Sequence, residues 1–377
     1  MGKDEIIFVA GGTGMVGAAI IRKLLASDYT SIVSNYHNRK PASGLSPSVT
    51  FLPLDLTRQR ETEQFFESAR PQHVYLAAAK VGGILANDTY PAQFIYDNIM
   101  IAGNVINAAH KFGVKKLLNL GSSCIYPKFA PQPMTEERLL TGALEPTNEA
   151  YAIAKIAAIK LCRYFNEQYG ANFLSVMPAN LYGSHDNFNL ETAHVLPALI
   201  RKFHLAQLLR AGDFQALRAD IQRCALGFGL DEKIRFTDSS SIVSVVESAG
   251  ITREHVMLWG SGEPFREFLH VDDLAAACLM LMERYDYRNI GEFLNVGAGE
   301  DMRIKDLALL VKEIVGFEGD IRHDMTKKDG MPRKLLDSSR ARELGWSPVI
   351  GLAGGIQQTY TWYQQQNELS RDKPRRC

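Results

Sequence analysis

The feature that most constrains this chain is a glycine-rich turn that joins an apolar run to a helix-like segment near its start. The run Ile6–Ala10 is typical of a buried strand, and Met15–Ala26 is typical of a helix. Glycines let the chain turn tightly and let a pyrophosphate approach the backbone, while the helix N-terminus offers free N–H groups and the positive end of its dipole. The GxxGxxG spacing in "AGGTGMVGAAI" therefore predicts a dinucleotide site at Gly11, Gly12, Thr13, Gly14, Met15, Val16 and Gly17.

Strand-like and helix-like segments alternate through the first half of the chain. Five further apolar runs are expected strands: Ser31–Tyr36, Val49–Leu54, His73–Ala77, Lys116–Leu120 and Asn172–Met177. Three further helices are expected between them, at Arg58–Ala69, Pro91–Phe112 and Asn148–Tyr169. This alternation predicts an α/β fold of the Rossmann type, with a doubly wound parallel sheet covered by helices on both faces.

The pattern changes in the second half, where we expect a smaller C-terminal substrate-binding lobe. We predict an NADP(H)-binding Rossmann domain over residues 1–180, to which later segments at about 230–275 and 286–297 cross back. The substrate-binding lobe is expected mainly within residues 181–377. Residues 213–255 read as an insertion, which is a lid, an interface element or an excursion without a role, because long connections are often but not always functional.

Composition excludes several classes of protein. Lysine plus arginine number 42 and aspartate plus glutamate number 42, so no net charge favours nucleic acid or an anionic membrane. The five cysteines are odd in number, and no CxxC pair occurs, which argues against structural zinc or a disulfide framework. No apolar run approaches the roughly 18 residues of a membrane-spanning helix. We expect a cytoplasmic protein without a metal.

The region after the second expected strand bears on the choice of cofactor. An acidic residue there usually holds the ribose 2′-hydroxyl of NAD, but Tyr29–Leu54 contains none and carries Arg39 instead. A guanidinium binds a 2′-phosphate, so NADP(H) is favoured; the alternative is that the cations belong to a solvated loop. Asp55 follows the third strand and either contacts the adenine or caps the next segment.

Two motifs suggest catalysis. "YAIAK" places Tyr151 and Lys155 on one helix face, and a nearby ammonium is expected to lower the pKa of the phenol. Ser122 follows a strand and is positioned to hydrogen-bond a carbonyl oxygen. Cys124, in "GSSCIYP", is less easily assigned, because a cysteine there is buried filler, a nucleophile or an acid–base group.

The order of glycine turn, serine and Tyr–Lys helix resembles the extended, sugar-nucleotide-modifying branch of the short-chain dehydrogenase/reductase superfamily. Within that branch the chain is similar to the GDP-L-fucose synthase family over most of residues 5–205 and 256–363. The strings that carry the resemblance are "VYLAAAKVGGILAND", "LGSSCIYPKFAPQPM", "EPTNEAYAIAKIAAIKLC", "MPANLYGSHDNF", "LWGSG", "REFLHVDD" and "PRKLLD".

The resemblance implies an NADPH-dependent enzyme, expected to be a homodimer, that epimerises C3 and C5 of GDP-4-keto-6-deoxy-D-mannose and then reduces C4. It assigns the proton transfers of epimerisation to Cys124 and His194, and carbonyl reduction to Ser122, Tyr151 and Lys155. Its expected contacts with the GDP-sugar are Lys202, Trp259, Arg266 and Asp329. We expect the nicotinamide side of the cofactor cleft to be lined by Ala77–Lys80, which includes Ala78, and by Pro178, Ala179, Asn180 and Leu181, because open α/β sheets bind ligands at the carboxyl ends of their strands. Lys155 and His194 are also expected to contact the cofactor.

Three alternatives remain at this point. A related enzyme acting on a 3,6-dideoxy sugar would make GDP-L-colitose. A cofactor-retaining 4,6-dehydratase or 4-epimerase ranks lower, because such dehydratases commonly carry Thr and an acidic pair where this chain has Ser122, Ser123 and Cys124. A non-catalytic, cofactor-sensing protein would typically lack Tyr151 or Lys155, and both are present.

Overall fold

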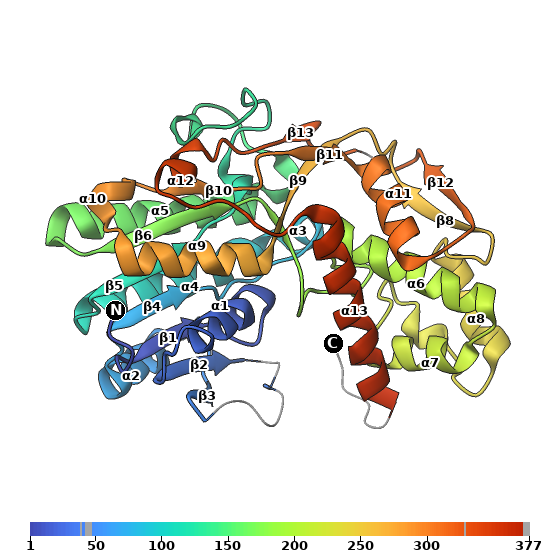
Figure 1. The fold of residues 1–377 in the computed structure, drawn as a ribbon, viewed down its shortest axis with the longest axis horizontal. Helices are drawn as coiled ribbons and strands as arrows, with labels where there is room; N and C mark the ends of the chain where they lie inside the picture. The colour runs from blue at the N-terminus through green and yellow to red at the C-terminus, as the bar shows by residue number, and fades with distance from the viewer. Residues whose placement is uncertain (38–39, 42–46, 328, 372–377) are drawn as a thin grey trace.

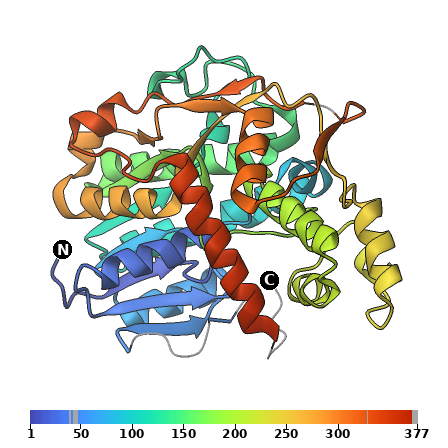
Figure 2. The ribbon, with the colours of Figure 1, turned by 45° about the vertical axis from the view of Figure 1, so that its right-hand side comes forward.

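The computed structural model describes residues 1–37, 40–41, 47–327 and 329–371. The chain forms two lobes, which lie side by side in Figure 1 with the long C-terminal helix between them. The N-terminal lobe is built on a large parallel sheet, and the second lobe on helices packed against small sheets (Figures 1 and 2).

The central sheet has seven parallel strands in the order β10-β6-β5-β4-β1-β2-β3. Its strands are β1 (Ile7–Ala10), β2 (Ile32–Tyr36), β3 (Val49–Pro53), β4 (His73–Leu76), β5 (Lys116–Leu120), β6 (Phe173–Pro178) and β10 (Leu294–Val296). The expected doubly wound Rossmann-type fold is confirmed, and each of the six expected strands is found within one residue of its expected start. The strand order reverses direction between β1 and β4, where sheets of this kind bind ligands at the carboxyl ends of their strands.

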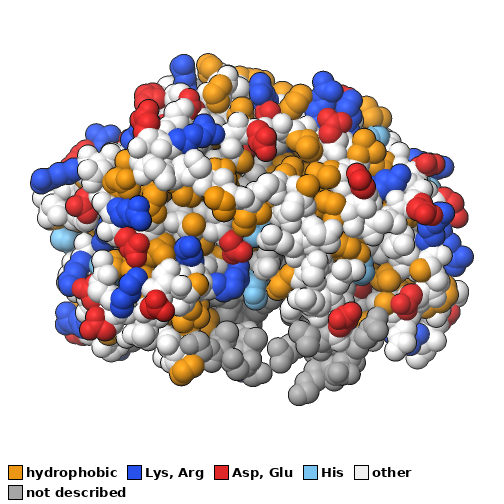
Figure 3. Space-filling model, viewed as in Figure 1, with side chains coloured by type: hydrophobic (Ala, Val, Ile, Leu, Met, Phe, Trp, Pro, Cys, Tyr) orange, Lys and Arg blue, Asp and Glu red, His pale blue; other side chains and the backbone are white. Residues whose placement is uncertain are grey.

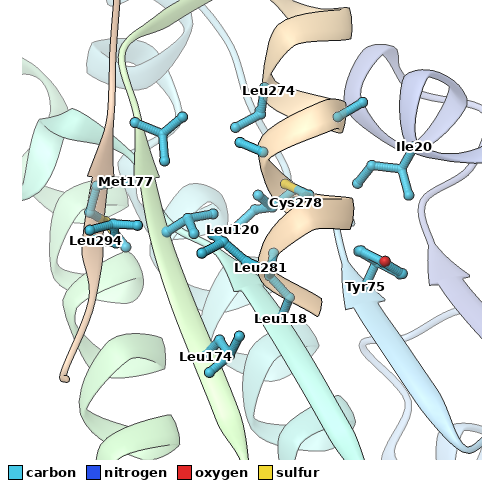
Figure 4. Packing of buried hydrophobic residues seen from close by; sticks show 14 of the residues in the cluster. Ile20, Tyr75, Leu118, Leu120, Leu174, Met177, Leu274, Cys278, Leu281 and Leu294 are labelled. Atoms are coloured by element: carbon cyan, nitrogen blue, oxygen red, sulfur yellow. The ribbon is translucent and has the colours of Figure 1, made fainter. Parts of the chain in front are cut away.

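Helices cover both faces of this sheet because alternate side chains of each strand point to opposite faces. Ile7 and Val9 pack toward α1 and α9, whereas Phe8 and Ala10 pack toward α2, α4 and α5. Figure 4 shows the first of these clusters, with Leu274 and Cys278 of α9 lying over the sheet. The covering helices are α1 (Met15–Leu25), α2 (Gln59–Ala69), α4 (Pro91–Lys111), α5 (Glu149–Tyr169) and α9 (Val271–Arg284).

Short helical segments connect the strands of the first lobe. They are α3 (Ile84–Thr89), η1 (Ser123–Ile125), η2 (Glu136–Arg138), η3 (Pro146–Asn148), α10 (Tyr287–Ile290) and α12 (Ser339–Glu343). Segment 286–297 supplies β10 at the edge of the central sheet, and α12 packs against this strand. Of segment 230–275, the part up to residue 270 lies in the second lobe, and α9 begins the return to the sheet.

The second lobe holds its own core, formed by helices packed on two small sheets. Strand β9 (Phe265–His270) pairs with β7 (Asn180–Tyr182), β11 (Asp301–Arg303) and β13 (Arg333–Lys334), while β8 (His255–Trp259) pairs with β12 (Asp320–Asp324). The helices are α6 (Val195–Ala211), α7 (Phe214–Arg223), η4 (Asp231–Lys233), α8 (Ser239–Ser248), α11 (Ile304–Val315) and α13 (Leu352–Arg371).

Candidate active site

A large cavity lies at the carboxyl ends of the central strands and extends to the second lobe. Its volume is about 2810 Å³, several times the roughly 300–1,000 Å³ typical of a site for one small ligand. Among the described residues, every expected site residue lines it: residues 11–17, Asp55, Ala78, Ser122, Cys124, Tyr151, Lys155, residues 178–181, His194, Lys202, Trp259, Arg266 and Asp329. The cavity is therefore large enough for a dinucleotide and a second extended ligand together.

The glycine turn forms the dinucleotide end of the cavity. Gly11 has a positive φ of 83° and lies so close to Ala78 that a Cβ would come within 2.8 Å of its Cα. A Cβ on Gly17 would lie 2.2 Å from the carbonyl oxygen of Gly11. Gly14 is the N-cap of α1, and among the described residues no side chain caps this helix. Its first N–H groups are thus available to an anion.

Strand β2 supports the turn with neutral side chains. Asn35 Oδ1 accepts from Gly11 N at 2.8 Å, and Ser34 Oγ accepts from Gly12 N at 3.0 Å. Asp55 accepts two hydrogen bonds from Thr57; burial raises its pKa, but these bonds and nearby His37 lower it more. Arg39, the residue expected to bind a 2′-phosphate, lies outside the described residues.

Ser122 and Tyr151 meet at the carboxyl end of β5. Ser122 is the N-cap of η1 and accepts from Cys124 N at 3.3 Å. Its side chain faces the hydroxyl of Tyr151, in the first turn of α5, closely enough to oppose the effect of burial on the pKa of that phenol. Two hydroxyl groups thus converge at one point of the cavity wall, as binding a carbonyl oxygen requires.

The pKa of Tyr151 is raised in this structure, whereas the nearby Lys155 is expected to lower it. The Lys155 Nζ donates to the carbonyl of Leu120 at 2.8 Å and lies 5.7 Å from the centre of the Tyr151 ring. Burial raises the pKa of Tyr151, with a smaller contribution from Cys124, and burial lowers the pKa of Lys155 to about 8. Tyr151 is consequently a neutral phenol in this structure, which is the form that can donate a proton.

Cys124 lies between two nitrogen donors. Asn148 Nδ2 and Lys334 Nζ each donate to its sulfur at 3.4 Å. The thiol is partly exposed to the cavity, whereas the other described cysteines, Cys162, Cys224 and Cys278, are buried. The two donors fix the position of the sulfur at the cavity wall.

His194 lies at the start of α6 and is exposed to the interior of the same cavity. Enclosure by the surrounding protein lowers the pKa of its imidazole, and the positive charge of Lys334 lowers it further. The neutral ring therefore predominates near pH 7 in this structure.

Cations and an aromatic ring line the far end of the cavity. Lys202 Nζ donates to the carbonyl of Met257 at 2.9 Å, and burial lowers the pKa of Lys202 to about 8. Burial also lowers the pKa of Arg266. Trp259 is about half exposed. Asp329 accepts from the N–H and hydroxyl of Ser261, so its carboxylate holds the loop that follows β8.

The sequence reasoning did not single out Lys334, Asn148 or Phe228. Lys334 stands inside the quoted string "PRKLLD", and Asn148 stands three residues before Tyr151, so both lay within motifs already noted. Their contacts with Cys124 span 210 and 24 residues of sequence, and no local pattern reveals them. Phe228 lies in the segment read as an insertion, and it lines the cavity.

The residues that the structure describes contain neither a metal-binding cluster nor a membrane-spanning helix. Their His, Cys, Asp and Glu side chains form no group of three or more that could hold a metal ion. Within the same residues, none of the helices combines the length and apolar character needed to span a membrane.

Comparison with known sequences places these features in context. The chain matches the NAD dependent epimerase/dehydratase family over residues 7–222 and 215–297. It is 48% identical to GDP-L-fucose synthase 1 of Arabidopsis thaliana, with 96% of this chain and 94% of that protein covered. It is 44% identical to the GDP-L-fucose synthase of Escherichia coli (strain K12), with coverage of 97% and 98%. Identity to the GDP-L-colitose synthase of Yersinia pseudotuberculosis is 32%, with coverage of 97% and 99%.

Solved structures give a consistent result. A GDP-6-OMe-4-keto-L-xylo-heptose reductase from C. jejuni is 34% identical and superposes with a TM-score of 0.85, covering 97% of this chain and 99% of that one. A GDP-L-fucose synthetase from Naegleria fowleri bound to NADP is 26% identical, with a TM-score of 0.74 and coverage of 98% and 97%.

Proposed function

The chain belongs to the NAD dependent epimerase/dehydratase family and, within it, to the GDP-L-fucose synthases, and on that premise we propose that it converts GDP-4-keto-6-deoxy-D-mannose to GDP-L-fucose. The reaction epimerises C3 and C5 and then reduces C4. The observation that carries the proposal is a thiol between two nitrogen donors in the same cavity as the Ser122–Tyr151 pair. A simple reductase needs only the second of these arrangements.

A nicotinamide cofactor is indicated by the family and by the glycine turn, and we propose NADPH as its form. Residues 11–17 fit its pyrophosphate, because Gly11 and Gly17 leave no space for a Cβ and α1 lacks a side-chain cap among the described residues. The neutral end of β2, with Ser34 and Asn35, supports NADPH, since it offers no carboxylate to repel a 2′-phosphate. When bound, the cofactor supplies the hydride for C4.

We assign the proton transfers at C3 and C5 to Cys124 and His194. Protons next to a ketone are acidic because the carbanion delocalises onto the carbonyl oxygen. A base must remove such a proton from one face of the sugar, and an acid must return one to the other face. Cys124 is assigned as the base, because its sulfur faces the cavity between two nitrogen donors. His194 is assigned as the acid; a bound diphosphate would favour its imidazolium form.

We assign the proton delivered to the C4 oxygen to Tyr151. Reduction of a ketone requires a protonated donor, and the raised pKa of Tyr151 keeps the phenol neutral. Ser122, which lies beside this phenol, is assigned to hydrogen-bond the incoming oxygen and so to polarise the carbonyl during enolisation and reduction alike. Lys155, whose Nζ donates to the carbonyl of Leu120, is assigned to bind the cofactor.

The GDP-sugar is proposed to occupy the far end of the cavity. Lys202 and Arg266 are cations of lowered pKa that an anionic diphosphate would stabilise. Trp259 offers a flat surface, and Asp329 positions the loop beside it. Identities of 48% and 44% to the fucose enzymes of Arabidopsis thaliana and Escherichia coli exceed the 32% to the colitose enzyme, which favours the 6-deoxy sugar over a 3,6-dideoxy sugar.

We further propose a cytoplasmic homodimer. The four described cysteines are free, which fits a reducing compartment. Helices α4 and α5 cover the same face of the sheet and expose large apolar side chains at Tyr96, Ile99, Ile153 and Tyr164. Such a surface on a water-facing layer is typical of a protein–protein interface.

The test is turnover of GDP-4-keto-6-deoxy-D-mannose with NADPH in D2O, with cofactor absorbance and product NMR followed together. We expect stoichiometric loss of NADPH and solvent deuterium at both C3 and C5 of GDP-L-fucose. Loss of NADPH without deuterium at both carbons would instead identify a simple reductase. No loss of NADPH from folded protein would contradict the proposed reaction.

A further inference from the structure

The loop after α7 brings Phe228 into the cavity beside Trp259. The two ring centroids are 5.9 Å apart and the planes meet at 62°, an edge-to-face arrangement. Phe228 is 37% exposed and Trp259 is 48% exposed, and both line the cavity. An aromatic side chain with so much surface left open toward a cavity has a free face for a ligand.

The backbone holds this ring in a strained position. Phe228 has a φ of 57°, in the left-handed region that a large side chain rarely adopts, and it lies between Gly227 at 87° and Gly229 at 66°. The turn is fastened by specific contacts. Glu191 Oε2 accepts from Phe228 N at 2.7 Å, and the carboxylate of Asp231 accepts from Gly227 N at 2.8 Å. Strain kept in place by such contacts marks a position with a function.

The segment that carries the loop is anchored in the second lobe. Asp220 of α7 is fully buried, and it accepts from Arg201 of α6 at 3.1 Å and from Asn367 of α13 at 2.9 Å. Tyr363 of α13 donates to the same carboxylate. A helix tied to two others by buried charged contacts has a defined position, so the loop that follows it is placed firmly at the cavity wall.

The charges around the two rings match a nucleoside diphosphate. The Nζ atoms of Lys202 and Lys327 lie 5.8 Å and 5.2 Å from the centre of the Trp259 ring. Cations beside a flat apolar surface suit a ligand with phosphates next to an aromatic base, because phosphates bind ammonium groups and bases stack on aromatic side chains.

We propose that Phe228, together with Trp259, forms an aromatic corner that binds the guanine base of the GDP-sugar. The inference rests on the proposed function, and it gives segment 213–255 a role in nucleotide affinity. Phe228 has no group that can transfer a proton, so its contribution falls on binding of substrate rather than on the chemical steps.

The test compares Phe228→Gly with the wild type. Glycine removes the ring and also adopts a positive φ without strain, so loss of folding does not account for a loss of affinity. We expect the Kd for GDP, measured by titration calorimetry, to rise by about 5- to 150-fold, the range for losing a base–aromatic contact. The KM for the GDP-sugar should rise in parallel, with kcat and the Kd for NADPH nearly constant.

Two further variants sharpen the comparison. Phe228→Tyr keeps the ring and should retain GDP affinity. Phe129→Ala removes an exposed phenylalanine that does not line the cavity and should leave all constants unchanged.

Equal affinity for GDP in Phe228→Gly and the wild type would overturn this inference alone. A parallel loss of affinity for inorganic pyrophosphate would overturn it too, because the ring would then not act through the base. A wild type that binds no GDP would overturn the proposed function as well.

Discussion

In the proposed mechanism, Cys124 is the residue that distinguishes an epimerase-reductase from a plain reductase at this site. Its sulfur receives hydrogen bonds from Asn148 and Lys334, while the other described cysteines have no comparable exposure to the cavity. The serine and tyrosine needed for reduction lie beside it. Under the proposed assignments, epimerisation and reduction share one carbonyl-binding point and differ in which side chain transfers the proton.

We predict that Cys124→Ser slows epimerisation more than any later step. A serine hydroxyl is a far weaker base than a thiolate, and loss of a general base typically costs about 10²- to 10⁴-fold in rate. The measurement is the rate of deuterium incorporation at C3 and C5 of the keto-sugar in D2O without NADPH. Cys162→Ala, which removes a buried thiol outside the cavity lining, is the control and should exchange normally. Normal exchange in Cys124→Ser would make the thiol structural.

Lys334 links the two proposed proton-transfer groups. It donates to Cys124, and its charge is one of the two causes that lower the pKa of His194. We predict that Lys334→Met raises the pKa of His194, because a positive charge that disfavours the imidazolium is removed while the enclosure by protein remains. Histidine ring resonances titrated by NMR in the free protein check this directly, with His194→Gln used to assign the signal.

The same change should be visible in the pH dependence of activity. If His194 acts as an imidazolium, the limb of kcat/KM that falls with rising pH reports its pKa in the free enzyme, and Lys334→Met should move that limb to higher pH. The maximal rate should fall at the same time, since the thiolate loses a stabilising cation. An unmoved limb would mean that His194 is not the acid.

At the scale of elements, the strand–turn–helix unit β1–α1 depends on contacts that leave no space for a Cβ. We predict that Gly17→Ala weakens NADPH binding by at least about tenfold, because the added carbon would lie 2.2 Å from the Gly11 carbonyl and displace the turn. Fluorescence titration with NADPH measures this. Gly354→Ala in α13 is the matched control, since a Cβ there meets no atom within 4 Å and should leave NADPH binding unchanged.

The first lobe was predictable because its strands are mostly apolar and alternate with helices along the sequence. The strands β1, β4 and β5 are buried along their whole length, so their composition alone marks them. The strands of the second lobe were not predictable from the sequence. Strands β7, β11 and β13 have only two or three residues each, and each is defined by its pairing with β9. The contact between Lys334 and Cys124 is a product of that pairing, and no spacing in the sequence encodes it.

The tyrosine–lysine pair shows a second limit of sequence patterns. An i,i+4 spacing places two side chains on one helix face, but it does not fix where the ammonium points. Lys155 turns its Nζ to Leu120 of β5, and burial then dominates the pKa of Tyr151. Direction and burial come from tertiary packing, so the proximity was predictable and the sign of the pKa shift was not.

At the scale of the whole molecule, the two lobes share one cavity and expose a surface of mixed charge. Lysine and arginine side chains are interspersed with aspartate and glutamate over the face seen in Figure 3, in keeping with 42 of each sign in the sequence. Association through such a surface depends on apolar patches rather than on net charge. The exposed apolar side chains of α4 and α5 are the patch that the dimer proposal uses.

We predict that Ile99→Glu converts the protein to a monomer. Ile99 is 39% exposed on α4, one turn from Tyr96, and a carboxylate buried in an interface without a partner is strongly unfavourable. Sedimentation velocity over a range of protein concentrations should show a dimer for the wild type and a monomer for the variant.

Leu309→Glu places the same charge at an exposed leucine of α11 in the second lobe and should remain dimeric. Because neither residue lines the cavity, both variants should bind NADPH normally, so a change in mass can be read as a change in assembly. A dimer in Ile99→Glu would move the interface away from α4, and a monomeric wild type would remove the dimer from the proposal.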